Sequence, residues 1–394
     1  MTPACIDDFR LLAKARLPSF LFDYIDGGSY SESTMRANIA DLQRLKLRQQ
    51  VMRDVSQIDL STTLFGRPAA MPVALAPIGL AGMYARRGEV QAVRAAEDAG
   101  IPFILSASSC CGMEEVAAGA TQPFPFQLYM IRDRGFLKEM LARVTALGVE
   151  TLVLTVDLIV HSARYRDVRS SLTGAQGAGA RLRRFGQIIS HPAWAWDVGV
   201  RGGPHTLGNF APLMPDGAGL AQFTRWVSRN FDPSITWADL DWIRQHWSGR
   251  LVIKGVLDPA DAVAACDAGA AAIIVSNHGG RQLDGAPSTI SALPGVVKAV
   301  AGRTDVLMDG GIRSGIDILR AMALGAKGVL LGRAWAYALA AQGGAGVARM
   351  LDLLRHEMAV AMALTGQTDV KRLDPEMLLP SIAAPHLDGG APSP

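Results

Sequence analysis

The stretches AMALGAKGVLLGR (321–333) and ACDAGAAAIIVSN (265–277) decide the fold of this chain. Each begins as an amphipathic helical segment, turns at a glycine and continues as a short run of aliphatic residues. A glycine after a helix takes the left-handed backbone conformation at little cost. An unbroken aliphatic run suits a strand that is buried on both faces, as in parallel sheets. Each stretch therefore predicts a helix followed directly by a buried parallel strand.

The same layout recurs along the chain, in AAEDAGIPFILS (95–106) and VTALGVETLVLTVD (144–157). The glycines expected to end the four helices are Gly100, Gly148, Gly269 and Gly325. The remaining strand candidates are MPVALAP (71–77), PFQLYM (125–130), LVIKG (251–255) and DVLMDGG (305–311). Together these segments make about eight strands separated by helix-sized lengths, which predicts a (β/α)8 TIM barrel over about residues 70–365.

A doubly wound α/β sheet is the alternative, but none of these strands is followed by G-x-G-x-x-G and a helix. The residues before the barrel predict an N-terminal helical segment, and we interpret residues 1–394 as a single domain. The interval of about 170–235 interrupts the alternation with Gly, Arg and Trp residues, which predicts a long insertion after the fourth strand. It is interpreted either as a lid over the active site or as a membrane-contact segment.

Composition excludes several classes of protein. The chain has 394 residues, of which 49% are hydrophobic and 19% charged, as is typical of a globular protein. A formal charge of +3 without a basic run predicts no nucleic-acid partner. The four cysteines lack metal-site or disulfide spacing, so we expect reduced thiols and no metal. We find no secretory signal and no run of about 20 apolar residues, which predicts a cytoplasmic protein with at most peripheral membrane contact.

Polar side chains gather where the predicted strands end. In a TIM barrel these ends meet at one rim, which carries the active site. The rim would bring together His278 and Arg281, both from SNHGGRQLDG (276–285), with Lys254 and Asp309. An imidazole base beside a planar guanidinium suits the handling of a hydroxy acid. A histidine that is only hydrogen-bonded in a turn is the alternative, and the nearby arginine disfavours it.

A glycine-rich run indicates a phosphate site. DGGIRSG (309–315) and the dipeptide at 332–333 place backbone N–H groups and arginines after strands seven and eight, where many barrels bind phosphate. A tight turn alone explains the run about equally well. Lys254 lies in an aliphatic strand and needs a negative partner, either a reduced flavin ring or an ion pair with Asp157 or Asp309. Taken together, these features predict a phosphate-bearing cofactor.

The chain resembles the FMN-dependent 2-hydroxy acid oxidases and dehydrogenases, and within that family it is most similar to the bacterial membrane-associated L-lactate dehydrogenases. The resemblance covers nearly the full length, and SNHGGRQLDG (276–285) is its most specific motif. The other matching segments are FDYIDGG (22–28), APIGLAGMYARRGE (76–89), FQLYM (126–130), TVD (155–157), ARYRD (163–167), HPAWAWDVG (191–199), IKG (253–255) and DGGIR (309–313).

The resemblance implies a role for each matched residue. His278 would be the general base, and Asp157 would hydrogen-bond it and stabilise its cationic form. The residues that contact substrate would be His278, Tyr24, Tyr129, Arg164 and Arg281. The residues that hold FMN would be Pro77, Ile78, Gly79, Ser106, Gln127, Thr155, Lys254 and Ser276, with Asp309, Gly311, Arg313, Gly332 and Arg333 toward the ribityl chain and phosphate.

The resemblance also implies oxidation of L-lactate to pyruvate, with electrons passed to a membrane quinone or another acceptor, by a homotetramer on the cytoplasmic side of the inner membrane. His278 would take either the C2 proton or the hydroxyl proton. One segment, LIVHSA (158–163), lacks the Pro and Gly usual in lactate-oxidising relatives. A mandelate-type aromatic acid therefore remains an alternative substrate, and O2 an alternative acceptor. His161 either borders the substrate side chain or is a solvated loop residue.

Overall fold

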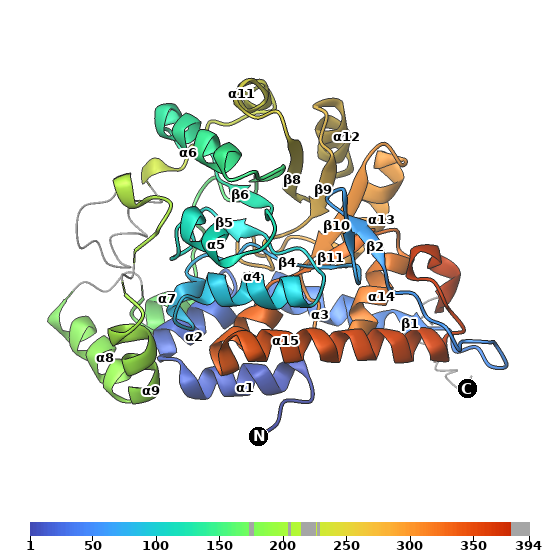
Figure 1. The fold of residues 1–394 in the computed structure, drawn as a ribbon, viewed down its shortest axis with the longest axis horizontal. Helices are drawn as coiled ribbons and strands as arrows, with labels where there is room; N and C mark the ends of the chain where they lie inside the picture. Colours follow the sequence, from blue (N-terminus) through green and yellow to red (C-terminus); the bar gives the residue numbers. More distant parts are fainter. Residues whose placement is uncertain (173–176, 204–205, 214–225, 227–228, 380–394) are drawn as a thin grey trace, which may run out of the picture.

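The computed structural model describes residues 1–172, 177–203, 206–213, 226 and 229–379. Its centre is an eight-stranded parallel sheet in the order β4-β11-β10-β9-β8-β7-β6-β5 (Figure 1). Backbone hydrogen bonds from Leu75 N to Pro102 O (2.9 Å) and from Ile104 N to Leu75 O (3.1 Å) join the first strand to the second and close the sheet. The predicted TIM barrel is therefore confirmed. The strands are β4 (Val73–Leu75), β5 (Leu105–Ser106), β6 (Phe126–Leu128), β7 (Thr151–Thr155), β8 (Arg250–Val256), β9 (Ala272–Val275), β10 (Asp305–Asp309) and β11 (Gly328–Leu331).

Helices follow the strands and cover the outside of the barrel. Four of them end at the predicted glycines, whose positive φ angles confirm the expected left-handed turns: Gly100, Gly148, Gly269 and Gly325. The longest helix contains a break at Gln342 and Gly343. The helices are α4 (Gly88–Asp98), α5 (Met113–Gly119), α6 (Arg134–Ala146), α11 (Asp239–His246), α12 (Pro259–Asp267), α13 (Thr289–Val300), α14 (Gly315–Ala323) and α15 (Arg333–Leu364).

Side chains alternate strictly between the two sides of the barrel wall, because successive strand residues point to opposite faces. One buried cluster fills the barrel interior and includes Val153, Val252, Ile274, Leu307 and Leu330. Their sequence neighbours, such as Leu152 and Leu154, belong to the cluster between strands and helices. The interior is closed at its amino end by Leu64 and Phe65 of a hairpin, β2 (Thr62–Leu64) and β3 (Arg67–Ala69).

The same alternation makes the barrel interior polar at its carboxyl end. Two residues after Val153, Val252 and Leu307 the inward positions are occupied by Thr155, Lys254 and Asp309 respectively. The corresponding positions near the ends of other strands are Ser106, Gln127 and Ser276. All six side chains are buried. An apolar core is therefore capped by a layer of largely buried polar groups.

An N-terminal helical segment packs against the barrel, as predicted. It consists of α1 (Ile6–Arg16), α2 (Ser19–Asp26) and α3 (Ser33–Arg44), and α1 runs alongside α15 (Figure 1). Farther along, β1 (Lys46–Leu47) pairs with β12 (Leu378–Leu379).

The predicted insertion lies between β7 and β8. It follows α7 (Tyr165–Arg169), and its described elements include α8 (Ala178–Ile189), α9 (Pro192–Trp194), a π-helical turn (Ala195–Val200) and a 3-10 turn (Ala211–Leu213). Helix α8 lies at the edge of the molecule (Figure 1). Parts of the interval 170–235 lie outside the described residues, and its bounds stay a prediction.

Gly311 shows how tightly the loop after β10 packs on the N-terminal segment. Its φ is +83°, and a Cβ there would lie 2.2 Å from the carbonyl oxygen of Asn38. We predict that Gly311→Ala destabilises the apoprotein by at least about 2 kcal/mol more than Gly302→Ala. Gly302 is the matched control, since its φ is +76° with no atom within 4 Å. Thermal or urea unfolding of both variants checks this, and equal losses would refute the close contact.

Candidate active site

A cavity of about 1330 Å³, a volume that includes its opening to solvent, lies at the carboxyl ends of the strands. It is lined by the predicted substrate-side residues Tyr24, Tyr129, Arg164, His278 and Arg281. Of the predicted cofactor residues, the lining includes Pro77, Ile78, Gly79, Lys254, Asp309, Gly311, Arg313, Gly332 and Arg333. The other four, Ser106, Gln127, Thr155 and Ser276, are buried in the polar layer at the strand ends. Residues distant in sequence are thus gathered at one place.

His278 and Asp157 form a hydrogen-bonded pair at the cavity. The Nδ1 atom of His278 lies 2.8 Å from Oδ1 of Asp157. Burial lowers the pKa of His278, and the neighbouring carboxylate opposes that shift without reversing it. The ring is therefore neutral near pH 7, and donation from Nδ1 to Asp157 leaves the lone pair at Nε2. This arrangement can accept a proton and then stabilise the resulting cation.

The backbone at His278 is held in an unusual conformation. Its φ is +56°, a value that a side-chain-bearing residue seldom adopts. The amide of Asn277 fixes the loop, because its Oδ1 accepts from Gly280 N (3.0 Å) and its Nδ2 donates to Asn38 Oδ1 (2.8 Å). Asn38 returns a bond to Asn277 Oδ1 (2.9 Å). This reciprocal amide pair connects α3 to the loop that carries His278.

Two arginines flank the aromatic ring of Tyr24. The guanidinium carbons of Arg281 and Arg164 lie 4.9 and 5.9 Å from the ring centroid. Burial, and then the charge of Arg281, lowers the pKa of Arg164 to about 10. The Nε atom of Arg164 is buried without a partner in the described part of the chain. Two cations that lie close together in this way form a site for an anion, and a carboxylate matches their planar geometry.

Arg333 and Arg313 also line the cavity. Burial lowers the pKa of Arg333 to about 9, and the charges of Arg281 and Arg313 contribute. The guanidinium of Arg333 already donates to the carbonyl oxygens of Ile25, Gly27 and Gly279. Arg333 therefore ties two loops together in addition to lining the cavity. A second anion beside these cations would relieve their repulsion.

Lys254 lies in the buried polar layer between Ser276 and Asp309. Its Nζ donates to Ser276 Oγ (2.9 Å) and lies 3.1 Å from Asp309 Oδ2. Burial lowers the pKa of Lys254, but Asp309 and Asp157 raise it by more, so the net shift is upward. Of the two interpretations left open by the sequence, the ion pair with Asp309 is present. The lysine nevertheless faces the cavity, so this ion pair does not prevent contact with a cofactor.

The polar layer fits an FMN molecule. Three buried atoms of this layer have no hydrogen-bond partner among the described residues: Gln127 Nε2, Thr155 Oγ1 and Asp309 Oδ1. Such atoms are costly unless a ligand pairs with them. The set offers donors and acceptors for a flavin ring, while Arg313 and the glycines after β10 suit a phosphate. No group of three or more His, Cys, Asp or Glu within the described ranges could hold a metal ion.

Apolar side chains line part of the cavity. Phe231 stacks on Tyr129 with ring centroids 4.9 Å apart, and Leu158 and Leu172 complete this wall. His161 also lines the cavity, which favours the first of its two interpretations. Desolvation, and then the charges of Arg164, Arg281 and His278, lowers the pKa of His161 to about 4.

Some residues that organise the site carried no signal in the sequence. Asn38 lies 239 positions from Asn277, and neither has a spacing that would reveal the pair. Asp26 lies within the FDYIDGG segment (22–28), but the resemblance implies no role for this residue. Only the tertiary structure brings these residues to the loops that they hold.

A closed (β/α)8 barrel with a base, clustered cations and unsatisfied polar groups at its mouth defines a cofactor-dependent oxidoreductase of the flavin type. The family model described as FMN-dependent dehydrogenase matches residues 13–380. This protein belongs to that family, is an FMN-dependent dehydrogenase and uses FMN as its cofactor.

Known relatives share most of the chain. An L-lactate dehydrogenase of Caulobacter sp. (strain K31) is 57% identical over 371 residues, which is 94% of this chain and 97% of the relative. One of Chromohalobacter salexigens is 54% identical, covering 97% of this chain and 96% of the relative.

Among solved structures, a monotopic membrane protein, (S)-mandelate dehydrogenase, has a TM-score of 0.89 and 35% identity, with 96% and 100% of the two chains covered. A mandelate oxidase has a TM-score of 0.80 and 37% identity over 95% and 98%. The chain is thus similar to proteins that are named for two different hydroxy acids.

The contact between His278 and Asp157 leads to a prediction for the pH dependence of activity. Asp157→Asn removes the charge that raises the pKa of His278, so that pKa falls further. A base must be neutral to act, so the acid limb of the kcat/KM profile should move to lower pH, while kcat drops about 10- to 1000-fold. Steady-state kinetics across pH checks this. The control is Asp267→Asn, an exposed carboxylate. An acid limb that moves to higher pH would contradict the assignment.

Proposed function

We propose that the protein oxidises L-lactate to pyruvate and passes the electrons to a membrane quinone. The observation that supports this most strongly is the pair of guanidinium groups, buried Arg164 and partly buried Arg281, beside His278 in one cavity. A substrate carboxylate bound between the two arginines would offset part of their charge, and the carbon that bears the 2-hydroxyl would then lie near His278. Relatives that are 54–59% identical are named L-lactate dehydrogenase, and this favours lactate over other hydroxy acids.

Each residue of the site has a role in this proposal. Arg164, Arg281 and Tyr24 bind the carboxylate, and Tyr129 donates to the substrate oxygen at C2. His278 takes a proton from the substrate at Nε2, and Asp157 stabilises the imidazolium. When bound, FMN would supply an acceptor for the two electrons and the second proton released from the substrate. Lys254 and the cations around Arg313 offset negative charge on the cofactor.

A mandelate-type acid is the second candidate. Its support is the apolar wall with Phe231, the LIVHSA segment (158–163) and the similarity to solved mandelate-oxidising proteins. Lactate is favoured because the relatives named for it share a larger fraction of residues. Direct use of O2 as acceptor is the oxidase alternative, and the homotetramer and the cytoplasmic side of the membrane also stay predictions.

The colour of the bound flavin reports directly which 2-hydroxy acid reduces it. We predict that the purified protein is yellow. Under anaerobic conditions, L-lactate should bleach the absorbance band near 450 nm, which is about where any oxidised flavin absorbs. Stopped-flow absorbance should give a larger second-order rate constant of flavin reduction for L-lactate than for (S)-mandelate, with D-lactate as the control. Bleaching by mandelate alone would replace lactate with the second candidate. Absence of bleaching by every 2-hydroxy acid would reject the proposed function.

The insertion carries features that support peripheral membrane contact. Leu182, Phe185 and Ile189 on α8 are 72%, 58% and 60% exposed and follow a helical spacing of one face. Trp196 in the following π-helical turn is 61% exposed. Three arginines, Arg181, Arg183 and Arg184, lie on the same helix. Within the described part of the chain, no helix is both long and apolar enough to cross a membrane. An amphipathic surface helix fits these observations.

Vesicle flotation tests this contact. We predict that replacing Leu182, Phe185 and Ile189 by Ser releases the protein from phosphatidylglycerol vesicles, while its activity on L-lactate with a soluble dye is kept. The matched control replaces Val51 and Met52 by Ser, since both are exposed apolar residues far from α8 in sequence. Unchanged flotation of the α8 variant would show that another surface binds the membrane.

A further inference from the structure

Asp26, at the end of α2, is a buried carboxylate outside the cavity lining. It accepts hydrogen bonds from Arg10 on α1 (2.5 and 2.9 Å), Arg166 on α7 (2.7 Å) and the hydroxyl of Tyr337 on α15 (2.7 Å). Burial alone would raise the pKa of the Asp26 carboxyl, but these donors hold it well below its usual value. Asp26 is therefore charged, and it joins four elements of the structure.

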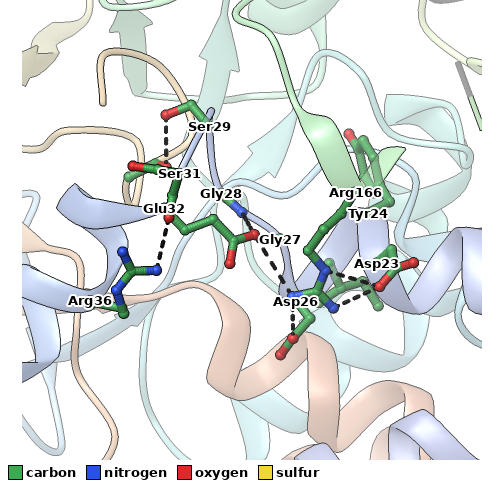
Figure 2. A network of polar contacts seen from close by, with 12 residues as sticks. Asp23, Tyr24, Asp26, Gly27, Gly28, Ser29, Ser31, Glu32, Arg36 and Arg166 are labelled. Atoms are coloured by element: carbon green, nitrogen blue, oxygen red, sulfur yellow. Dashed lines mark hydrogen bonds and ion pairs between the residues drawn. The ribbon is translucent and has the colours of Figure 1, made fainter. Parts of the chain in front are cut away.

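Three of the elements that Asp26 joins, α2, α7 and α15, also carry or adjoin a residue of the cavity. Tyr24 precedes Asp26 by two positions on α2, and Arg164 precedes Arg166 by two positions at the start of α7. Arg333 lies one helical turn before Tyr337 on α15. In Figure 2, Arg166 extends toward both Asp23 and Asp26, beside Tyr24. The carboxylate thus fixes the relative positions of side chains that it does not touch.

The end of α2 also holds two further cations of the cavity, Arg281 and Arg333, directly. The Nη1 atom of Arg281 donates to the carbonyl oxygens of Tyr24 (2.6 Å) and Gly27 (3.0 Å). Arg333 donates to Gly27 O (2.7 Å) and to Ile25 O (3.1 Å). Carbonyls at the end of a helix lack partners within it and carry partial negative charge, so they suit cations. Both arginines share the carbonyl of Gly27.

The arginines of the cavity carry like charges, and their mutual repulsion has to be offset. Arg164, Arg281, Arg313 and Arg333 line one cavity and repel one another before an anion binds. A buried negative charge behind them opposes that repulsion, and the attached helices set the spacing of the guanidinium groups. His278 itself has further contacts that do not involve Asp26: its ring pairs with Asp157, and the amide pair of Asn277 and Asn38 holds its loop.

We propose that Asp26 is a positioning residue, which keeps Tyr24, Arg164 and Arg281 at the spacing of a substrate carboxylate without contacting the substrate. The proposal rests on the proposed oxidation of a 2-hydroxy acid. It separates the two parts of the site: loss of Asp26 weakens substrate binding, whereas proton removal by His278 is largely kept.

The test compares kinetic constants of the FMN-loaded protein. Asp26→Asn keeps the shape but removes the charge, so KM for L-lactate should rise about 10-fold or more while kcat changes less than about 3-fold. The dissociation constant of oxalate, a dicarboxylate that is not oxidised, should rise by a similar factor in a titration of the flavin absorbance. FMN content and the melting temperature are recorded for each variant.

The matched control is Asp197→Asn. Asp197 pairs with Arg16 of α1 at 3.0 Å but is joined to no cavity residue, so KM and the oxalate constant should stay at the values of the unmodified protein. If Asp26→Asn does not fold, Arg10→Met replaces it, because Arg10 is 40% exposed. Arg10→Met should raise KM, and Arg10→Lys should restore most of the loss.

An unchanged KM and oxalate constant in folded Asp26→Asn would overturn the proposal. A loss confined to kcat would also overturn it, because the carboxylate would then act on the chemical step. Failure of the proposed function has a different result, since the unmodified protein would then show no flavin bleaching with any 2-hydroxy acid.

Discussion

The structure depends on one constraint of β geometry: side chains of a barrel strand alternate between the interior and the outer layer. In this barrel the interior is aliphatic until the last inward position of most strands, where polar residues such as Thr155 and Lys254 take over. These groups are buried, and several lack partners among the described residues. The layer is complete only when a polar ligand lies across it, which is the physical basis for cofactor binding at this end.

The barrel alone does not make the site. The N-terminal segment supplies Tyr24 and the carbonyls that hold Arg281 and Arg333. Its α3 helix contributes Asn38, whose amide pair supports a strained backbone at His278. Strain of this kind costs of order 1–3 kcal/mol and persists only where the surroundings enforce it. The helices outside the barrel therefore hold in place the barrel loops that carry the site.

Much of this could be predicted from the sequence, because the relevant signals are local. Gly100, Gly148, Gly269 and Gly325 indicate where helices give way to strands. The SNHGGRQLDG motif (276–285) locates a base and a guanidinium in one loop. Long-range contacts could not be predicted, since Asp26 and Tyr337 are separated by 311 positions.

The hydrogen-bond partners of the Arg333 side chain also could not be predicted from the sequence. Its guanidinium lines the cavity and also donates to three backbone carbonyls, while its place toward the ribityl chain and phosphate stays a prediction. The sequence indicated where the charge lies along the chain but not which partner satisfies it. Such a choice depends on which carbonyls the N-terminal segment leaves free.

A crystal structure with FMN and pyruvate tests the central claim most directly. The account predicts that the pyruvate carboxylate lies within hydrogen-bond distance, about 3 Å, of both Arg164 and Arg281. Its C2 oxygen should be beside His278 and Tyr129, with the cofactor across the polar layer. Pyruvate bound away from these two arginines, or FMN bound outside the barrel mouth, would contradict the account.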